Sequence, residues 1–317
     1  MSARSIACCI LLLLLTWPLS AGAGESFSRL YVFGDSLSDT GNLAAVTGGF
    51  PDPPFFEGSR VSNGPVGVET LADGLGLEAL PSLHLLMPAT GTNYAVAGAN
   101  AAGTEPIDLP VQLTLFLANH GGVAPPDALY VVFIGGNDVR AARDAANFLE
   151  AWKTLSAGVV AQAGTIRALA AAGARNFLVV NSPDIGLIPE TSELALERGE
   201  LRLRQRATAY SWLYNAMLAR RVAHIEGGLE VDIEEFDLFR IFRELIGNPE
   251  TYGFTNAQDA CLGPGLVPRP DCDFDRFVFF DNIHPTARVH EILGRAALAG
   301  IAEGTLEVAA PTVAGTR

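Results

Sequence analysis

The chain has 317 residues, of which 49% are apolar and 8% aromatic, and its formal net charge is −14. This composition excludes a collagen-like, fibrous or largely disordered chain, and it allows one sizeable hydrophobic core. The negative charge also argues against nucleic acid and anionic membrane surfaces as partners, because both repel an acidic protein.

The first 23 residues have the three parts of a secretory signal peptide. Arg4 gives a positive start, an apolar run extends from Ile6 to Leu15, and the small residues Ala21–Ala23 form a cleavage site. The run is short for a membrane span, although an uncleaved anchor is the alternative. We therefore expect a secreted or periplasmic protein whose mature chain, 24–317, is one domain, a monomer, and without a transmembrane segment.

Short apolar or alternating runs bounded by turn formers predict four strands, Leu30–Phe33, Leu129–Ile134, Phe177–Asn181 and Leu229–Phe236. Longer stretches with helical periodicity predict helices over Val66–Leu75, Leu109–Asn119, Asn147–Ala172, Thr191–Ile225 and Thr286–Ala299. This alternation predicts an α/β sandwich with a mainly parallel sheet. In such sheets functional sites form beyond the carboxyl ends of the strands, where the polar clusters of this sequence fall.

A serine follows the first predicted strand, in Gly34-Asp35-Ser36. Its position just past a buried strand, behind a glycine, can expose the hydroxyl at the edge of the sheet. A serine hydroxyl is a weak nucleophile until a neighbouring base removes its proton. Taken alone, this segment favours a polar turn with a capping serine.

An acid and a base stand together 245 residues later, at Asp281 and His284. The apolar run Phe277–Phe280 before them predicts a strand that brings them to the same edge of the sheet. The carboxylate can then hold Nδ1–H of the imidazole and leave Nε2 for the serine proton. The alternative is a helix-capping aspartate and a surface histidine. The other histidines have no comparable setting and are interpreted as structural or surface residues: His84, His120, His224 and His290.

Acyl transfer also needs hydrogen-bond donors for the oxyanion that develops on the attacked carbonyl. Asn137 follows two glycines at the end of the second predicted strand, so its amide can point into a cleft. The small-residue turn around Gly98 lets a backbone N–H approach a ligand closely. Each cluster is a weak signal singly, and their joint order is the informative feature.

In that order the clusters resemble the conserved blocks of the GDSL, or SGNH, esterase/lipase family. The first, second, third and fifth blocks are matched by Phe33–Asn42, Asn93–Ala99, Gly135–Asp138 and Asp281–Thr286. The likeness runs from about residue 29 to 300 and includes the segments Arg60–Gly64 and Asn181–Pro189.

The resemblance implies a flavodoxin-like three-layer α/β/α sandwich, which is the SGNH hydrolase fold. It implies Ser36 as nucleophile, with Asp281 and His284 as the acid and base of the triad. The oxyanion donors would be the backbone N–H groups of Ser36 and Gly98 and the side-chain amide of Asn137.

Two cysteines remain after the predicted leader, Cys261 and Cys272, with ten residues between them. In an oxidising compartment they predict a disulfide that closes a Gly/Pro-rich loop, with two free thiols as the alternative. No Cys or His partner stands at metal-ligand spacing nearby, so we expect no metal and no cofactor. The acidic stretch Asp271–Asp275 lacks the spacing of a known calcium loop and is interpreted as a solvated face.

The sequence therefore predicts a serine esterase or lipase acting on small-molecule or lipid esters. Lysophospholipase, choline-ester hydrolase, short-chain esterase and sugar O-acetyl esterase remain open as specific activities. The alternative from another class is a non-catalytic exported binding protein on the same scaffold.

Overall fold

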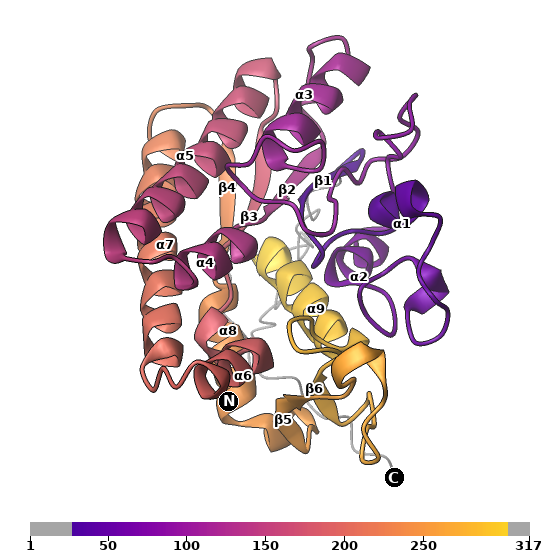
Figure 1. The fold of residues 1–317 in the computed structure, drawn as a ribbon. Coiled ribbons are helices and arrows are strands. Elements are labelled where there is room, and N and C mark those ends of the chain that lie inside the picture. The colour runs from indigo at the N-terminus through magenta and orange to yellow at the C-terminus, as the bar shows by residue number, and fades with distance from the viewer. Residues whose placement is uncertain (1–26, 304–317) are drawn as a thin grey trace, which may run out of the picture.

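The computed structural model describes residues 27–303, shown in Figure 1. The predicted signal peptide, 1–23, lies outside the described residues. Four parallel strands form the main sheet in the order β1 (Leu30–Gly34), β2 (Leu129–Phe133), β3 (Asn176–Val180) and β4 (Asp232–Phe236). All four predicted strands are confirmed, although β4 is shorter than the alternating pattern suggested.

A fifth segment runs beside the free edge of β1. The N–H of Tyr94 donates to the carbonyl of Val32 at 2.7 Å, and the N–H of Val96 donates to the carbonyl of Gly34 at 3.2 Å. The chain around Asn93 thus lies parallel to β1, on the side opposite β2. The spatial order, with a second chain segment outside the first strand, is the flavodoxin-like order that the family resemblance implied.

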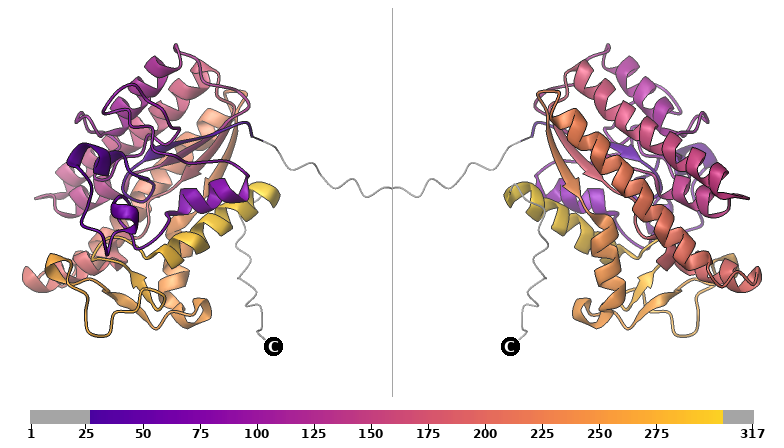
Figure 2. Two further views of the ribbon diagram at one scale, coloured as in Figure 1. Left: turned by 90° about the vertical axis from the view of Figure 1, so that its right-hand side faces the viewer. Right: turned by 90° about the vertical axis from the view of Figure 1, so that its left-hand side faces the viewer.

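Helices cover both faces of the sheet and make the predicted three layers (Figures 1 and 2). One face is covered by α2 (Gly67–Gly74) and α9 (Ala287–Glu303), which pack closely on each other. The opposite face is covered by α3 (Leu109–Asn119), α5 (Phe148–Ala172) and α7 (Leu203–Glu226).

Almost all residues of β1, β2 and β3 are buried on both faces, as continuous apolar runs predict for a parallel sheet, whereas β4 is partly exposed. On the face toward α3, the rings of Tyr31 and Tyr130 stack with centroids 5.4 Å apart. The ring of Phe116 from α3 meets Tyr31 edge-on at 5.0 Å. These aromatic side chains therefore pack α3 against β1, the strand that precedes Ser36.

The predicted helix over Thr191–Ile225 is wrong in one respect, because the structure divides it into α6 (Pro189–Glu197) and α7. The chain turns at Gly199, whose φ of 65° is left-handed. The N–H of Glu200 then donates back to the carbonyl of Ala195 at 2.9 Å, which closes the end of α6. A glycine within a charged, periodic stretch was the available signal for this break.

Several short elements were not predicted. They are α1 (Asn42–Thr47), α4 (Gly136–Arg143), α8 (Leu238–Gly247) and the 3₁₀ turns Phe56–Gly58, Ile185–Leu187, Pro249–Tyr252 and Pro264–Leu266. Most of them follow a strand or connect two longer helices, where few residues are available to show a period.

The helix α5 is the one helix of residues 27–303 that is long and apolar enough to cross a membrane. Half of its most apolar stretch is buried in the protein, at 50%. It packs against α3, α4 and α7. These contacts within the fold account for its apolar residues.

The apolar run Phe277–Phe280 does not join the main sheet. Its residues Phe277–Phe279 form β6, which pairs with β5 (Asn256–Ala260) in a separate two-stranded sheet. The chain after β6 still reaches the carboxyl end of β1. From that point α9 runs back along the main sheet (Figure 1). The helix predicted over Thr286–Ala299 is confirmed as α9, beginning one residue later.

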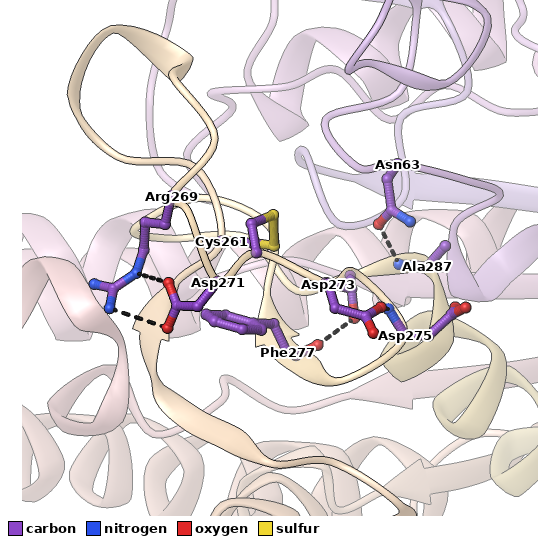
Figure 3. Close-up of a disulfide and its surroundings, with 10 residues drawn as sticks. Asn63, Cys261, Arg269, Asp271, Asp273, Asp275, Phe277 and Ala287 are labelled. Carbon is purple, nitrogen blue, oxygen red and sulfur yellow. Dashed lines mark hydrogen bonds and ion pairs between the residues drawn. A yellow bond between two sulfur atoms is a disulfide. The ribbon is translucent and has the colours of Figure 1, made fainter.

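Cys261 and Cys272 form a disulfide beside this small sheet, with Cα atoms 4.8 Å apart (Figure 3). The acidic stretch next to it is held by local contacts. Arg269 donates to the Asp271 carboxylate at 3.1 Å, and Asp273 accepts the N–H of Asp275 at 3.0 Å. Asp271 is therefore engaged within the loop that the disulfide closes, and Asp273 just after it.

Candidate active site

The structure brings Ser36, His284 and Asp281 together at the carboxyl end of β1. The Oγ of Ser36 lies 2.9 Å from Nε2 of His284. The Nδ1 of the same ring lies 2.8 Å from Oδ2 and 3.0 Å from Oδ1 of Asp281. Since a carboxylate only accepts, Nδ1 carries the proton and Nε2 is free to accept from the serine hydroxyl.

The carboxylate of Asp281 also shapes the turn that carries His284. Its Oδ1 accepts the backbone N–H groups of Ile283 at 2.8 Å and of His284 at 2.7 Å. The carbonyl of His284 accepts the N–H of Phe280 at 2.8 Å, so the turn closes on itself. One side chain therefore sets both the backbone of the turn and the orientation of the imidazole.

Contacts from a distant segment fix the chain just after His284. The hydroxyl of Ser62 donates to the carbonyl of Pro285 at 3.0 Å. The side chain of Asn63 accepts the N–H of Ala287, the first residue of α9, at 3.0 Å (Figure 3). A Cβ on Gly64 would lie 2.4 Å from the Cβ of Ala287, so only glycine allows this approach.

The ionisation of Asp281 follows from these contacts. Burial raises the pKa of this carboxyl, but the charge and hydrogen bond of His284, together with two backbone N–H groups, outweigh burial and lower the pKa below 3.8. The carboxylate is therefore ionised at neutral pH, where it stabilises a positive charge on the imidazole.

The loop after β1 is built on Asp39, whose side chain is buried. It accepts the N–H groups of Gly41 and Asn42 at 2.7 Å each and that of Ala97 at 2.8 Å. This carboxylate joins the loop of Ser36 to the loop of Gly98. Sequence analysis did not single out Asp39, although it lies in the block that resembles the first family motif.

The predicted oxyanion donors come from three segments, the Ser36 loop, the Gly98 loop and the start of α4. Gly98 has a φ of 89°, which only glycine adopts without strain, and it is exposed. Within residues 27–303 no backbone acceptor engages the N–H of Ser36 or of Gly98. Both N–H groups are thus available to a ligand.

Asn137 lies in the first turn of α4 and lines the same cleft as Ser36 and His284. Its Nδ2 donates to the carbonyl of Ala99 at 2.9 Å, and its Oδ1 accepts from Arg140 at 3.0 Å. These bonds turn the amino group of the amide toward the Gly98 loop and leave its second hydrogen for another acceptor.

Glu190 connects the asparagine to the triad turn. Its carboxylate accepts from Arg140 at 2.9 Å and from the fully buried Arg143 at 2.8 Å. Its backbone N–H donates to the carbonyl of Asn282, within the triad turn, at 2.8 Å. No periodic signal in the sequence predicted this pairing, because its members are far apart in the chain.

Two more carboxylates are buried under the site. Asp138 accepts the N–H of Ala101 at 2.8 Å, and Asp35 accepts that of Leu37 at 3.0 Å. Burial raises the pKa of each to about 6, because neither has a direct cationic partner to offset desolvation.

The cleft beside Ser36 is small, with a volume of about 50 Å³. Apart from the residues named above, its walls are mostly apolar and include Ile185, Ile188, Leu238, Phe242, Ile283 and Leu293. Across residues 27–303, no three His, Cys, Asp or Glu side chains stand together to hold a metal ion. The arrangement suits an ester with an apolar part that faces these walls.

The comparison with known sequences decides the family. The GDSL-like Lipase/Acylhydrolase family matches residues 30–297. The chain belongs to this family. Membership places it among carboxylic ester hydrolases, in agreement with the clusters found in the sequence.

Three curated proteins are similar to this chain. Lipase 1 of Photorhabdus luminescens is 26% identical over 86% of this chain and 50% of its own length. The phosphatidylcholine-sterol acyltransferase of Aeromonas hydrophila is 29% identical over 83% of this chain and 73% of its own. A GDSL esterase/lipase of Arabidopsis thaliana is 28% identical over 82% and 79%, respectively. The chain spans half the length of Lipase 1.

The buried carboxyl of Asp35 predicts a pH-dependent stability. The folded state keeps this proton up to a pKa of about 6, whereas the unfolded chain loses it near 3.8. The free energy of unfolding should therefore fall as the pH rises through this window. In Asp35→Asn, which cannot ionise, we expect stability relative to the native protein to rise by about 1–3 kcal/mol between pH 4 and pH 7.

Denaturant unfolding of both proteins at each pH measures this difference. A stability difference between Asp35→Asn and the native protein that stays constant across pH would contradict the assignment of a raised pKa to Asp35.

Proposed function

We propose that this protein is an exported serine esterase that hydrolyses carboxylic esters through an acyl-enzyme, with Ser36, His284 and Asp281 as its triad. The observation that carries the proposal is the continuous hydrogen-bonded path from the Ser36 hydroxyl to the Asp281 carboxylate through one imidazole. The predicted leader and the Cys261–Cys272 disulfide support export to an oxidising compartment.

In the first step Nε2 of His284 takes the proton of Ser36 as Oγ attacks the ester carbonyl carbon. The carbonyl π bond becomes an oxyanion, and His284, now positive, is stabilised by Asp281. The tetrahedral intermediate collapses, the bond to the alcohol oxygen breaks, and Nε2 returns its proton to the leaving alcohol. The acyl group stays on Ser36.

In the second step a water molecule occupies the place that the alcohol left. His284 removes its proton as the water oxygen attacks the acyl carbonyl, and a second oxyanion forms. When this intermediate collapses, the bond to Oγ breaks and Nε2 returns the proton to Ser36. The products are the carboxylic acid and the free enzyme.

We expect three donors to face the position where each oxyanion forms. The N–H groups of Ser36 and Gly98 are free of backbone acceptors in the described chain, and Asn137 has an unused amide hydrogen. Preorganised donors stabilise the developing charge without having to reorient, which lowers the barrier to both steps.

The nucleophile is tested with Ser36→Ala and a fluorophosphonate probe. The native protein should be labelled once, at Ser36, and should hydrolyse p-nitrophenyl esters. Because removing the nucleophile abolishes the acyl-enzyme, Ser36→Ala should lose labelling and fall to background hydrolysis while keeping the native circular dichroism spectrum. A native protein that neither reacts nor hydrolyses any ester would favour the exported binding protein instead.

The amide donor is tested with Asn137→Ala. Loss of one oxyanion donor should lower kcat by about 10²–10³-fold. Asn119→Ala, which removes an amide from the C-terminal end of α3, is the matched control and should keep native turnover. If kcat of Asn137→Ala equals that of the native protein, the side chain is not an oxyanion donor.

A further inference from the structure

Asn137, the proposed amide donor to the oxyanion, is held by two neighbours with opposite hydrogen-bonding roles. The carbonyl of Ala99 can only accept, and it receives one hydrogen of Nδ2 at 2.9 Å. The guanidinium of Arg140 can only donate, and it binds Oδ1 at 3.0 Å. Because a carbonyl and a guanidinium cannot exchange these roles, the amide takes one orientation, which leaves the second hydrogen of Nδ2 for a ligand.

Arg140 is itself fixed by Glu190, which lies in the first turn of α6. The carboxylate accepts from Nε of Arg140 at 2.9 Å and also from Nη2, so the two groups meet through a pair of bonds. Since a guanidinium is planar and rigid, fixing two of its nitrogens also fixes the direction of the third. That third nitrogen, Nη1, is the one that donates to Asn137.

A second arginine keeps the carboxylate of Glu190 in place. The side chain of Arg143 is 2% exposed, and its Nη1 donates to Glu190 and to the hydroxyl of Thr191 at 2.8 Å each. Burial raises the pKa of Glu190, but the hydrogen bonds and charges of Arg140 and Arg143 outweigh burial and lower the pKa below 4.5. The carboxylate is therefore ionised at neutral pH, where it holds Arg140 as a charged partner.

The backbone of Glu190 contacts the other half of the site. Its N–H donates to the carbonyl of Asn282 at 2.8 Å, in the turn that carries Asp281 and His284. One residue of α6 therefore binds the triad turn through its main chain and, by way of Arg140, the oxyanion amide through its side chain. These contacts hold the amide and the imidazole in place relative to each other.

We propose that Arg140 is a positioning residue for the oxyanion site: held by Glu190, it directs the free amide hydrogen of Asn137 toward the oxyanion. The inference rests on the proposed function, because it requires an oxyanion that forms on the ester attacked by Ser36. Without Arg140 the amide would be held by Ala99 alone and could turn about its Cβ–Cγ bond. The bond to the oxyanion would then be made in only part of the molecules.

Arg140→Met is the variant that tests this role, and the structure indicates that it folds. The side chain of Arg140 is 26% exposed, and ion pairs of partly exposed groups add little to stability. Glu190 keeps Arg143 as its partner when Arg140 is removed, so no carboxylate is left buried without a cation.

The test is a double-mutant cycle with Asn137→Ala, measured with a p-nitrophenyl ester. Arg140→Met should lower kcat by about tenfold, a part of the loss expected for removing the donor, with KM within about twofold of native. In the Asn137→Ala background the same change should cause no further loss, because the amide that Arg140 directs is absent. A merely structural role would lower kcat by the same factor in both backgrounds, and that result, or a native kcat in Arg140→Met, would overturn the proposal.

Arg198→Met is the matched control. Arg198 pairs with Asp144, which keeps Arg143 as a second partner just as Glu190 does. Both variants thus remove one arginine from a carboxylate that retains Arg143. Arg198→Met should keep the native kcat and KM, and a loss equal to that of Arg140→Met would contradict a specific role for Arg140.

Glu190→Gln is a second variant in case Arg140→Met does not fold. A glutamine side chain has one oxygen, so it cannot accept both bonds from the guanidinium, and kcat should again fall only when Asn137 is present. If Asn137→Ala itself keeps the native kcat, the oxyanion assignment fails and this inference fails with it. If Asn137→Ala is impaired while folded Arg140→Met and Glu190→Gln are native, only the role of Arg140 is refuted.

A crystal structure of Arg140→Met after reaction with a small fluorophosphonate shows the amide directly. The phosphoryl oxygen should still lie within hydrogen-bond distance of the N–H groups of Ser36 and Gly98, whereas the amide of Asn137 should be turned away from it or occupy more than one orientation. An amide that keeps its native orientation and binds the phosphoryl oxygen would overturn the proposal.

Discussion

The site depends on one partly buried carboxylate, that of Asp281, which accepts three hydrogen bonds at once. Two come from the backbone of its own turn and one from the imidazole of His284. Because the same oxygens shape the turn and hold the ring, Nε2 can reach Ser36 only when the turn is correctly folded. The hydrogen bonds from the imidazole and from the two backbone N–H groups in turn keep Asp281 ionised despite its partial burial. The same hydrogen bonds therefore determine both the backbone conformation of the turn and the ionisation of Asp281.

Carboxylates that accept several hydrogen bonds also join other loops around the cleft, where distant parts of the chain meet. Asp39 joins the Ser36 loop to the Gly98 loop, and Glu190 joins Asn137, through Arg140, to the triad turn. Charge-assisted hydrogen bonds of this kind fix polar loops that have too few apolar residues to be held by packing. They carry a cost in stability wherever the carboxylate lacks a cationic partner, as at Asp35. The apolar core supports these loops from below.

Sequence patterns predicted the framework well, for reasons that are local. Buried parallel strands such as β2 are continuous apolar runs, and long helices such as α5 show a clear period and a terminal glycine. The order of the polar clusters also predicted the residues that the structure brings together at the carboxyl end of β1.

What could not be predicted depends on tertiary contacts. β6 has the same apolar character as a strand of the main sheet, yet pairs with β5. His290 was interpreted as structural or surface, and nothing in its sequence setting shows that its helix borders a cavity.

The most direct test of the central claim is a crystal structure of the protein after reaction with a small fluorophosphonate, whose tetrahedral phosphorus stands in for the oxyanion intermediate. The account predicts phosphorus bonded to Oγ of Ser36 and one phosphoryl oxygen about 2.7–3.1 Å from the N–H nitrogens of Ser36 and Gly98 and from Nδ2 of Asn137. The hydrogen bonds between His284 and Asp281 should be retained. Phosphorus on another residue, or a phosphoryl oxygen directed into solvent away from all three donors, would contradict it.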